Sequence, residues 1–159
     1  MTHVRRMDRA QAEIRYRDPT ERYETREPVI VVVQDDDERL GVLDSICECL
    51  GIAVERMSSN EDLAAKLRLH CPMAVVAEMD AEGQDGCHVL ITIAKYDRTL
   101  PALIITNDDP VSLGALDAVE ELWHVETVVK WPRLLGASEI VNFLFRAGRN
   151  GNCLGLVPV

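Results

Sequence analysis

Short apolar runs alternate along the chain with segments in which apolar residues recur every three or four positions. The short runs predict buried strands, and they cover residues 29–33, 52–57, 73–77, 101–106 and 126–130. The periodic segments predict helices at about 38–50, 61–70, 87–96, 110–122 and 139–147. Strict alternation of strands and helices predicts a parallel sheet with helices packed on both faces.

Several boundaries carry local signals. Gly51 follows the first helix as a C-terminal glycine, and Pro72 stops the second helix. The Asp109-Pro110 pair predicts a helix N-cap followed by proline at the first helical position. Trp131 and Pro132 predict a turn after the fifth strand, and Ser138 predicts the cap of the last helix.

Composition adds limits to this pattern. The chain has 159 residues, of which 47% are hydrophobic, so one domain with an aliphatic core is expected. Its formal net charge is −10, which argues against binding to nucleic acid or to an anionic membrane surface. No apolar run approaches the roughly 20 residues of a membrane span, and the start lacks the apolar core of a secretory signal. A cytoplasmic protein is expected.

The two ends of the chain differ from its middle. Residues 1–27 hold seven arginines and six acidic residues with few aliphatic ones, which predicts a flexible charged arm. Residues 28–159 hold ten basic and twenty-one acidic residues. We therefore predict an arm at 1–27, a folded domain at 28–147 and a C-terminal tail at 148–159, with no room for a further output domain after it.

Acidic residues gather where two of the predicted strands end. Residues 72–86 read PMAVVAEMDAEGQDG, so Glu78, Asp80 and Glu82 follow the third strand, and Asp85-Gly86 is a turn signal. A second acidic run, 35–38, follows the first strand. In open α/β sheets, ligands collect beyond the carboxyl ends of strands, so both groups are candidates for a functional site.

Residues 72–86 resemble, without a gap, a segment of the receiver domains of bacterial response regulators, P-D-L-V-L-L-D-x-x-M-P-x-x-D-G. The resemblance extends over about 28–147. It implies a flavodoxin-like (βα)5 fold, a doubly wound five-stranded parallel sheet of order 2-1-3-4-5. In receivers the last residue of the third strand is the aspartate that accepts a phosphoryl group. That position is Glu78 here.

The resemblance implies roles for other positions. Receivers hold magnesium with two acids after the first strand, and the match gives either Gln34 with Asp35 or Asp35 with Asp36. Both registers remain open. Magnesium binding is therefore optional, and its possible ligands are Asp35, Asp36, Glu78 and Asp80. Asp80 stands two residues after the acceptor position.

The fourth and fifth strands supply the remaining receiver positions. Thr106 matches the hydroxyl residue, and Lys130 matches the lysine, although Trp131 separates it from Pro132. Thr127 stands where many receivers carry an aromatic residue that rotates on activation. Glutamate is one methylene longer than aspartate, so we expect Glu78 to reach Lys130 and to be a poor nucleophile.

These residues predict a pseudo-receiver in two-component or phosphorelay signalling. It would act by protein–protein interaction, without conventional aspartate phosphorylation, without enzymatic activity and with no required cofactor. The expected partner is a histidine kinase, a phosphotransferase or another signalling protein. A homodimer through the fourth helix, fifth strand and fifth helix would follow the way receivers pair.

Two alternatives accompany this prediction. One is a phosphorylatable receiver that uses Glu78 or Asp80 with magnesium. The other is a magnesium-dependent phosphohydrolase on the same fold, using Asp35 or Asp36. A zinc site at His70-Cys71 and Cys87-His88 is disfavoured, because zinc ligands usually come in short paired spacings.

Overall fold

The computed structural model describes residues 27–34, 41–80, 83–106, 109–131 and 136–150. Strands and helices alternate throughout this part of the chain, as predicted. They are β1 (Val29–Val33), α3 (Gly41–Leu50), β2 (Ala53–Met57), α4 (Leu63–His70), β3 (Ala74–Glu78), α5 (Gly86–Tyr96), β4 (Ala102–Ile105), α6 (Pro110–Trp123), β5 (Val128–Trp131) and α7 (Ala137–Asn150).

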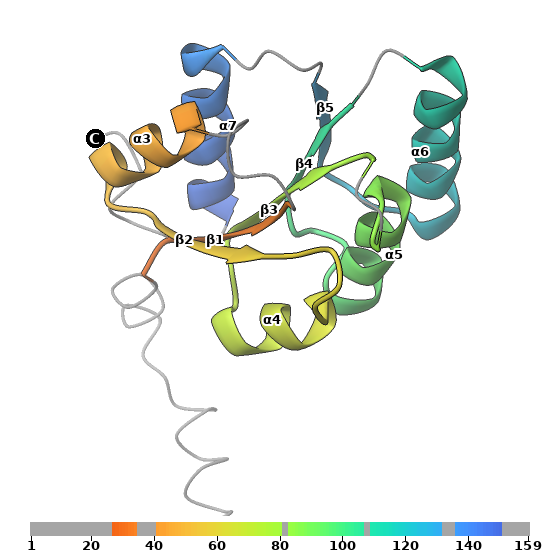
Figure 1. Cartoon of the computed structure of the whole chain (residues 1–159), viewed down its shortest axis with the longest axis horizontal. Helices are drawn as coiled ribbons and strands as arrows, with labels where there is room; N and C mark the ends of the chain where they lie inside the picture. The colour runs from red at the N-terminus through yellow and green to blue at the C-terminus, as the bar shows by residue number, and fades with distance from the viewer. Residues whose placement is uncertain (1–26, 35–40, 81–82, 107–108, 132–135, 151–159) are drawn as a thin grey trace, which may run out of the picture.

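The strands form one parallel sheet in the order β2-β1-β3-β4-β5, which confirms the predicted flavodoxin-like topology (Figure 1). The register brings Val33 beside Ala77, and Glu78 beside Ile105. Ile105 in turn pairs with Trp131. The carboxyl ends of β1, β3, β4 and β5 therefore lie at one level along one edge of the sheet.

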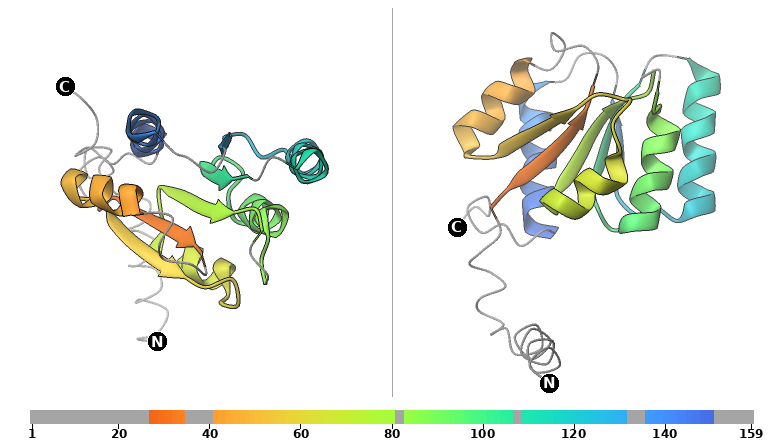
Figure 2. Two further views of the ribbon diagram at one scale, coloured as in Figure 1. Left: turned by 45° about the horizontal axis from the view of Figure 1, so that its top comes forward. Right: turned by 60° about the horizontal axis from the view of Figure 1, so that its bottom comes forward.

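Side chains from alternate strand positions build a separate core on each face of the sheet. Ile30 and Val32 of β1 pack with residues of α3 and α7. Val31 and Val33 pack with residues of α4, α5 and α6. Figure 2 shows these helices on the two faces. Burying each such aliphatic side chain contributes roughly 1.5–3 kcal/mol to the stability of the fold. Because successive side chains point to opposite faces, the position of a residue along its strand decides which helices it contacts.

Most helix ends follow the sequence signals. Asp109 caps α6, and Pro110 takes its first position, as predicted. Gly51 adopts a positive φ of 71° after α3, a conformation that glycine reaches without steric cost. Asp85 caps α5 and Asp62 caps α4, because each carboxylate accepts a backbone N–H of the first turn.

Predicted boundaries of the last strand and of the last helix are wrong. The fifth strand runs over Val128–Trp131, so Trp131 is its last residue and does not belong to a turn. The last helix begins at Ala137, so Ser138 lies inside it and is not its cap, and it continues to Asn150, past its predicted end at 147. Ala147 and Gly148 are both buried, so these small residues serve packing and do not end the helix. Most of the predicted arm and residues 151–159 of the predicted tail lie outside the described residues.

Within the described ranges, every helix is too short or too polar to cross a lipid bilayer.

Candidate functional site

Gln34 and Glu78 meet at the carboxyl end of the sheet. Gln34 directly follows β1 and is only 6% exposed, and Glu78 is the last residue of β3. The Gln34 side-chain amide donates a hydrogen bond from Nε2 to Glu78 Oε1, at 3.2 Å. The structure therefore brings together two of the predicted site residues.

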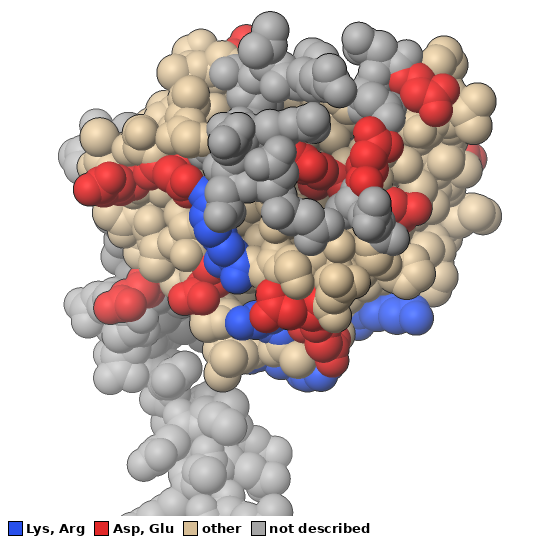
Figure 3. All heavy atoms as spheres, in the orientation of Figure 1, with Lys and Arg blue, Asp and Glu red and all other residues tan. Residues whose placement is uncertain are grey.

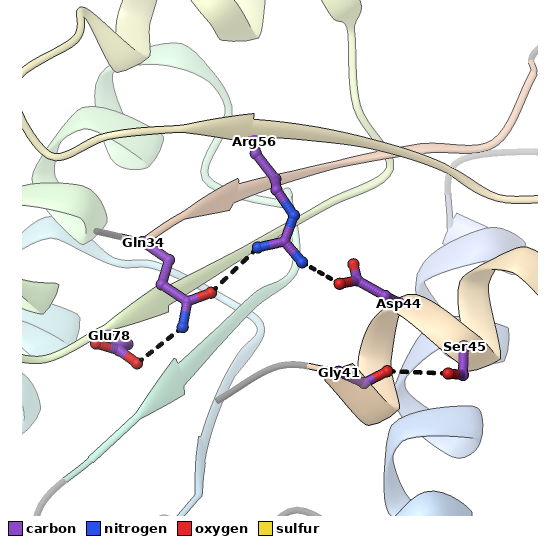
Figure 4. Close-up of polar contacts among 6 residues, drawn as sticks. All are labelled: Gln34, Gly41, Asp44, Ser45, Arg56 and Glu78. Atoms are coloured by element: carbon purple, nitrogen blue, oxygen red, sulfur yellow. Dashed lines mark hydrogen bonds and ion pairs between the residues drawn. The ribbon is translucent and has the colours of Figure 1, made fainter. Parts of the chain in front are cut away.

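Arg56 and Asp44 extend this contact into a row of four polar side chains, Asp44, Arg56, Gln34 and Glu78 (Figure 4). Arg56 Nη1 donates to Gln34 Oε1 at 3.4 Å, and Arg56 Nη2 pairs with Asp44 Oδ2. We call these four residues the polar row. Arg56 comes from β2 and Asp44 from α3, so the row links three strands to a helix.

Sequence reasoning did not predict Arg56 or Asp44 as site residues. One signal was available for Arg56. It follows Val54 by two positions in β2, and Val54 packs on the α3 and α7 side of the sheet. An arginine at an inward strand position needs a polar partner. The identity of that partner depends on how α3 packs.

The polar row fixes the orientation of the Gln34 amide. Arg56 has only donors, so the oxygen of the amide faces Arg56 and its NH₂ faces Glu78, which has only acceptors when ionised. The ion pair itself is partly exposed, with side-chain accessibilities of 31% for Arg56 and 42% for Asp44. Such pairs stabilise a fold by at most about 1 kcal/mol. The chief effect of the row is to position the Glu78 carboxylate.

Lys130 lies on the opposite side of the sheet from Glu78. Its Nζ pairs with the carboxylates of Asp117 and Glu120 on α6. Partial burial lowers the pKa of Lys130, but the hydrogen bonds and charges of the two carboxylates outweigh it, and the net shift is upward. The predicted Lys130–Glu78 contact is therefore wrong.

The strand register explains this error. Lys130 pairs with Ile104, whose side chain packs among α5 and α6 residues. Glu78 pairs with Ile105, which packs on the α3 and α7 side. Because successive strand residues point to opposite faces, Lys130 and Glu78 diverge.

Hydrogen bonds join the loop after β2 to the loop after β3. Gly83 N donates to Ser59 Oγ at 3.2 Å, and Gln84 Nε2 donates to Ser59 O at 3.0 Å. A Cβ on Gly83 would lie 2.5 Å from the Ser59 carbonyl oxygen, so only glycine allows this approach. We call this set of contacts the loop clamp.

Comparisons with known proteins support the topology. No family model matches the sequence, and no curated protein matches it. Solved structures do match. A response regulator receiver domain from Clostridium thermocellum has a TM-score of 0.64 and 18% identity, with 80% of this chain and 98% of that chain covered. A putative response regulator from Chloroflexus aurantiacus has a TM-score of 0.62 and 20% identity, covering 78% and 97%.

A third structure, the N-terminal signal receiver domain of a response regulator from Bacteroides fragilis, has a TM-score of 0.58 and 20% identity, with coverages of 76% and 95%. The chain has the receiver fold. At these identities the likeness concerns the fold, and it agrees with the resemblance carried by residues 72–86.

In the receiver fold the lysine of the fifth strand is usually followed directly by proline. Here the residue before Pro132 is Trp131. Trp131 is half-buried, packs on the α3 and α7 core, and lies in line with Ile105 and Glu78. The indole of Trp131 therefore lies on the side of the sheet where the Lys130 ammonium was expected.

Thr106 and Thr127, the other predicted switch positions, lie at opposite ends of the sheet. Thr106 is buried after β4, and its Oγ1 donates to the Trp131 carbonyl at 3.1 Å. Its backbone N–H donates to the same oxygen at 2.7 Å. Thr127 directly precedes β5, where its carbonyl accepts from Ala102 N at 2.9 Å, so it lies away from Glu78.

Only part of the predicted metal site lies within the described residues. Asp35 and Asp36 lie outside them, so the register of the acidic pair stays a prediction. Asp80 is exposed, two residues beyond Glu78 and after the buried Met79. No group of three or more His, Cys, Asp or Glu residues within the described segments is arranged to hold a metal ion, and neither His70-Cys71 nor Cys87-His88 contributes to one.

Proposed function

We propose that this chain is a receiver domain that signals through contact with other proteins and without phosphorylation of an aspartate. The observation that carries the proposal is the division of the site. The carboxylate at the acceptor position belongs to Glu78 and is bound by Gln34, while Lys130 is held on the other side by Asp117 and Glu120.

Phosphoryl transfer to a side chain demands more than a carboxylate at the right strand end. The attacking oxygen must lie in line with the donor to within about an ångström. Cationic groups must also face the charge that develops on the phosphoryl group. The extra methylene of Glu78 displaces the attacking oxygen, and the pairing of Lys130 with α6 removes a cation. Both features favour a domain that does not depend on phosphorylation.

The surface formed by α6, β5 and α7 is the proposed place of protein contact. On α6, Val111 and Leu122 are 78% and 76% exposed, whereas the ring of Trp123 lies against Lys95 of α5. Exposed aliphatic residues of this kind are typical of interaction surfaces. The partner would be a histidine kinase, a phosphotransferase, another signalling protein or a second copy. The formal net charge of −10 favours a partner with basic residues, and the face of the molecule in Figure 3 carries more acidic than basic side chains.

The first test is intact mass together with an amide NMR spectrum. Each would be recorded with magnesium and a small phosphodonor, and the spectrum also with beryllofluoride. A typical receiver domain serves as the positive control. We expect no added mass and no beryllofluoride shifts at Gln34, Glu78 or Thr106. Added phosphate on Glu78 or Asp80 would overturn the proposal in favour of a phosphorylatable receiver.

The contact surface is tested separately by sedimentation of the full chain and of Leu122→Asp. If copies associate through α6, the wild type sediments as a dimer and Leu122→Asp as a monomer. Leu69→Asp on α4 is the matched control, since Leu69 is also an exposed leucine, at 73%, but lies outside this surface. A dimer that Leu69→Asp disrupts and Leu122→Asp does not would contradict the assignment.

A further inference from the structure

We propose that residues 151–159 of this chain fold back and lie in the apolar groove between α3 and α7, with Cys153 beside Cys49. The inference goes beyond the proposed function, because it requires nothing of Glu78 or of a signalling partner. It depends on three features: the lining of the groove, the composition of the segment and the direction of the two helices.

The groove has a volume of about 410 Å³ and is lined chiefly by Val42, Ile46, Cys49 and Leu50 of α3 and by Val141 of α7. No Asp, Glu, Lys or Arg is among the described residues that line it. Val42 is 52% exposed and Cys49 is exposed as well. This is an apolar hollow on the surface of a chain in which 28% of residues are charged.

The segment that follows α7 matches this lining. Residues 151–159 read GNCLGLVPV, with no charged side chain and with Leu154, Leu156 and Val157 as its larger aliphatic residues. Pro158 restricts the backbone and lowers the entropy that docking removes. The groove and the segment are therefore alike in being uncharged and aliphatic.

The direction of the helices places the segment within reach. α3 and α7 each follow the carboxyl end of a strand, and they cover the same face, so both run back toward the amino end of the sheet (Figure 2). Asn150 at the end of α7 therefore lies at the same end of the sheet as Leu50 at the end of α3.

Nine residues are long enough for the path. Packed helices lie roughly 8–10 Å apart, and the distance along α3 from Cys49 back to Val42 is about 10 Å. An extended chain of nine residues spans about 30 Å. Three residues carry the chain from Asn150 to Cys153, next to Cys49, and Leu154 to Val157 then run along the groove toward Val42.

Disulfide trapping of the full chain tests this arrangement. Diamide at low protein concentration takes two electrons and two protons from a pair of nearby thiols and joins them. We expect a within-chain Cys49–Cys153 disulfide, identified by peptide mapping. Cys71 is the matched control, because it is also exposed but lies at the end of α4, on the other face of the sheet.

Two outcomes of the trapping would overturn the proposal. One is a Cys71–Cys153 disulfide that forms as fast as Cys49–Cys153. The other is a Cys49–Cys153 disulfide found only between chains, which would assign the groove to a second copy.

A second measurement needs no disulfide. In a Cys153→Ser background, the rate at which a thiol reagent modifies Cys49 is compared with and without Leu154→Asp and Leu156→Asp. We expect the intact segment to slow modification of Cys49 several-fold and to leave the rate at Cys71 unchanged. The circular dichroism spectrum and the Cys71 rate show whether each variant keeps the fold. Equal Cys49 rates in the two chains would contradict the proposal.

Discussion

The two halves of the sheet's carboxyl edge treat their charged residues differently. In the half built from β1, β2 and β3, the polar row holds Glu78 in contact with Gln34 and, through it, with Arg56. In the half built from β4 and β5, Lys130 turns away to α6 and Trp131 faces the α3 and α7 core. A carboxylate and an ammonium that are both near the carboxyl edge of the sheet thus belong to different faces.

This difference teaches that the position of a residue along its strand decides its chemistry as much as its type does. A shift of one residue would exchange the faces of Lys130 and Trp131. The predictions below alter one half of the edge at a time, or exchange a feature between halves.

The largest effect is expected from restoring a cation and an aspartate on the same face. The variant Glu78→Asp with Trp131→Lys should accept a phosphoryl group from a small donor with magnesium. Its rate should exceed that of Glu78→Asp alone by at least about tenfold, because a lysine would then face the acceptor. Intact mass against time measures both rates. Equal rates would show that Lys130 can serve from its present face.

The next effect concerns Cys47, which is buried on α3, three residues after Asp44 of the polar row. Burial, helped by the charge of Asp44, raises the pKa of the Cys47 thiol from 9.0 to about 11. The folded state therefore holds this proton more tightly than the unfolded state does. The resulting stability is complete below pH 9.0 and is lost as the pH rises toward about 11.

Cys47→Ala should remove this part of the alkaline loss, which we expect to be about 3 kcal/mol at most. Urea unfolding between pH 8 and pH 12 measures it. Cys49→Ala is the control, since Cys49 is exposed on the same helix. If Cys47→Ala and the wild type lose stability in parallel, the thiol is not the group that titrates.

A smaller effect is expected from Arg56→Met, which removes the cation of the polar row. The buried oxygen of Gln34 loses its donor, and Asp44 loses its ion pair. Because the pair is partly exposed, we expect the free energy of unfolding to fall by about 1 kcal/mol. Urea unfolding at neutral pH provides the value. A variant as stable as the wild type would mean that water replaces Arg56 at no cost.

The smallest effect is expected from Lys130→Met in the other half of the edge. Lys130 contacts Asp117, which is 66% exposed, and Glu120. Glu120 is 24% exposed, so both carboxylates keep contact with solvent when the lysine is removed. Unlike Arg56→Met, this change takes no donor from a buried amide, so a loss under about 0.5 kcal/mol is expected at neutral pH. The same unfolding experiment measures it beside Arg56→Met. A loss larger than that of Arg56→Met would reverse the order of the two halves.

The fold could be predicted from the sequence because its signals are local. The β-branched run 29–33, the Pro72 stop and the Asp109-Pro110 cap each mark an element without knowledge of the rest of the chain. The receiver-like spacing of 72–86 then supplied the strand order.

The site could be predicted only in part, because its contacts depend on pairing between distant strands. The end of the third strand identifies Glu78, and Gln34 belongs to one of the two registers that the sequence leaves open after the first strand. Lys130 was assigned to the wrong face, because the sequence Lys-Trp-Pro does not show whether lysine or tryptophan pairs with Ile105. Arg56 finds Asp44 only once α3 has packed on the sheet.

The hydroxyl of Thr106 is bonded to the main chain of β5, and this contact bears on how such a protein could carry information. Where a receiver's threonine reaches for a phosphoryl group, the domain is a switch whose message changes within one copy. A domain with this hydroxyl already engaged would present the same face at all times. Its signal would then depend on the concentration of the protein, which synthesis and degradation set. Half of the partner would be bound when the free concentration of this protein equals the dissociation constant. On the proposed function, regulation of such a protein would act on its synthesis and degradation.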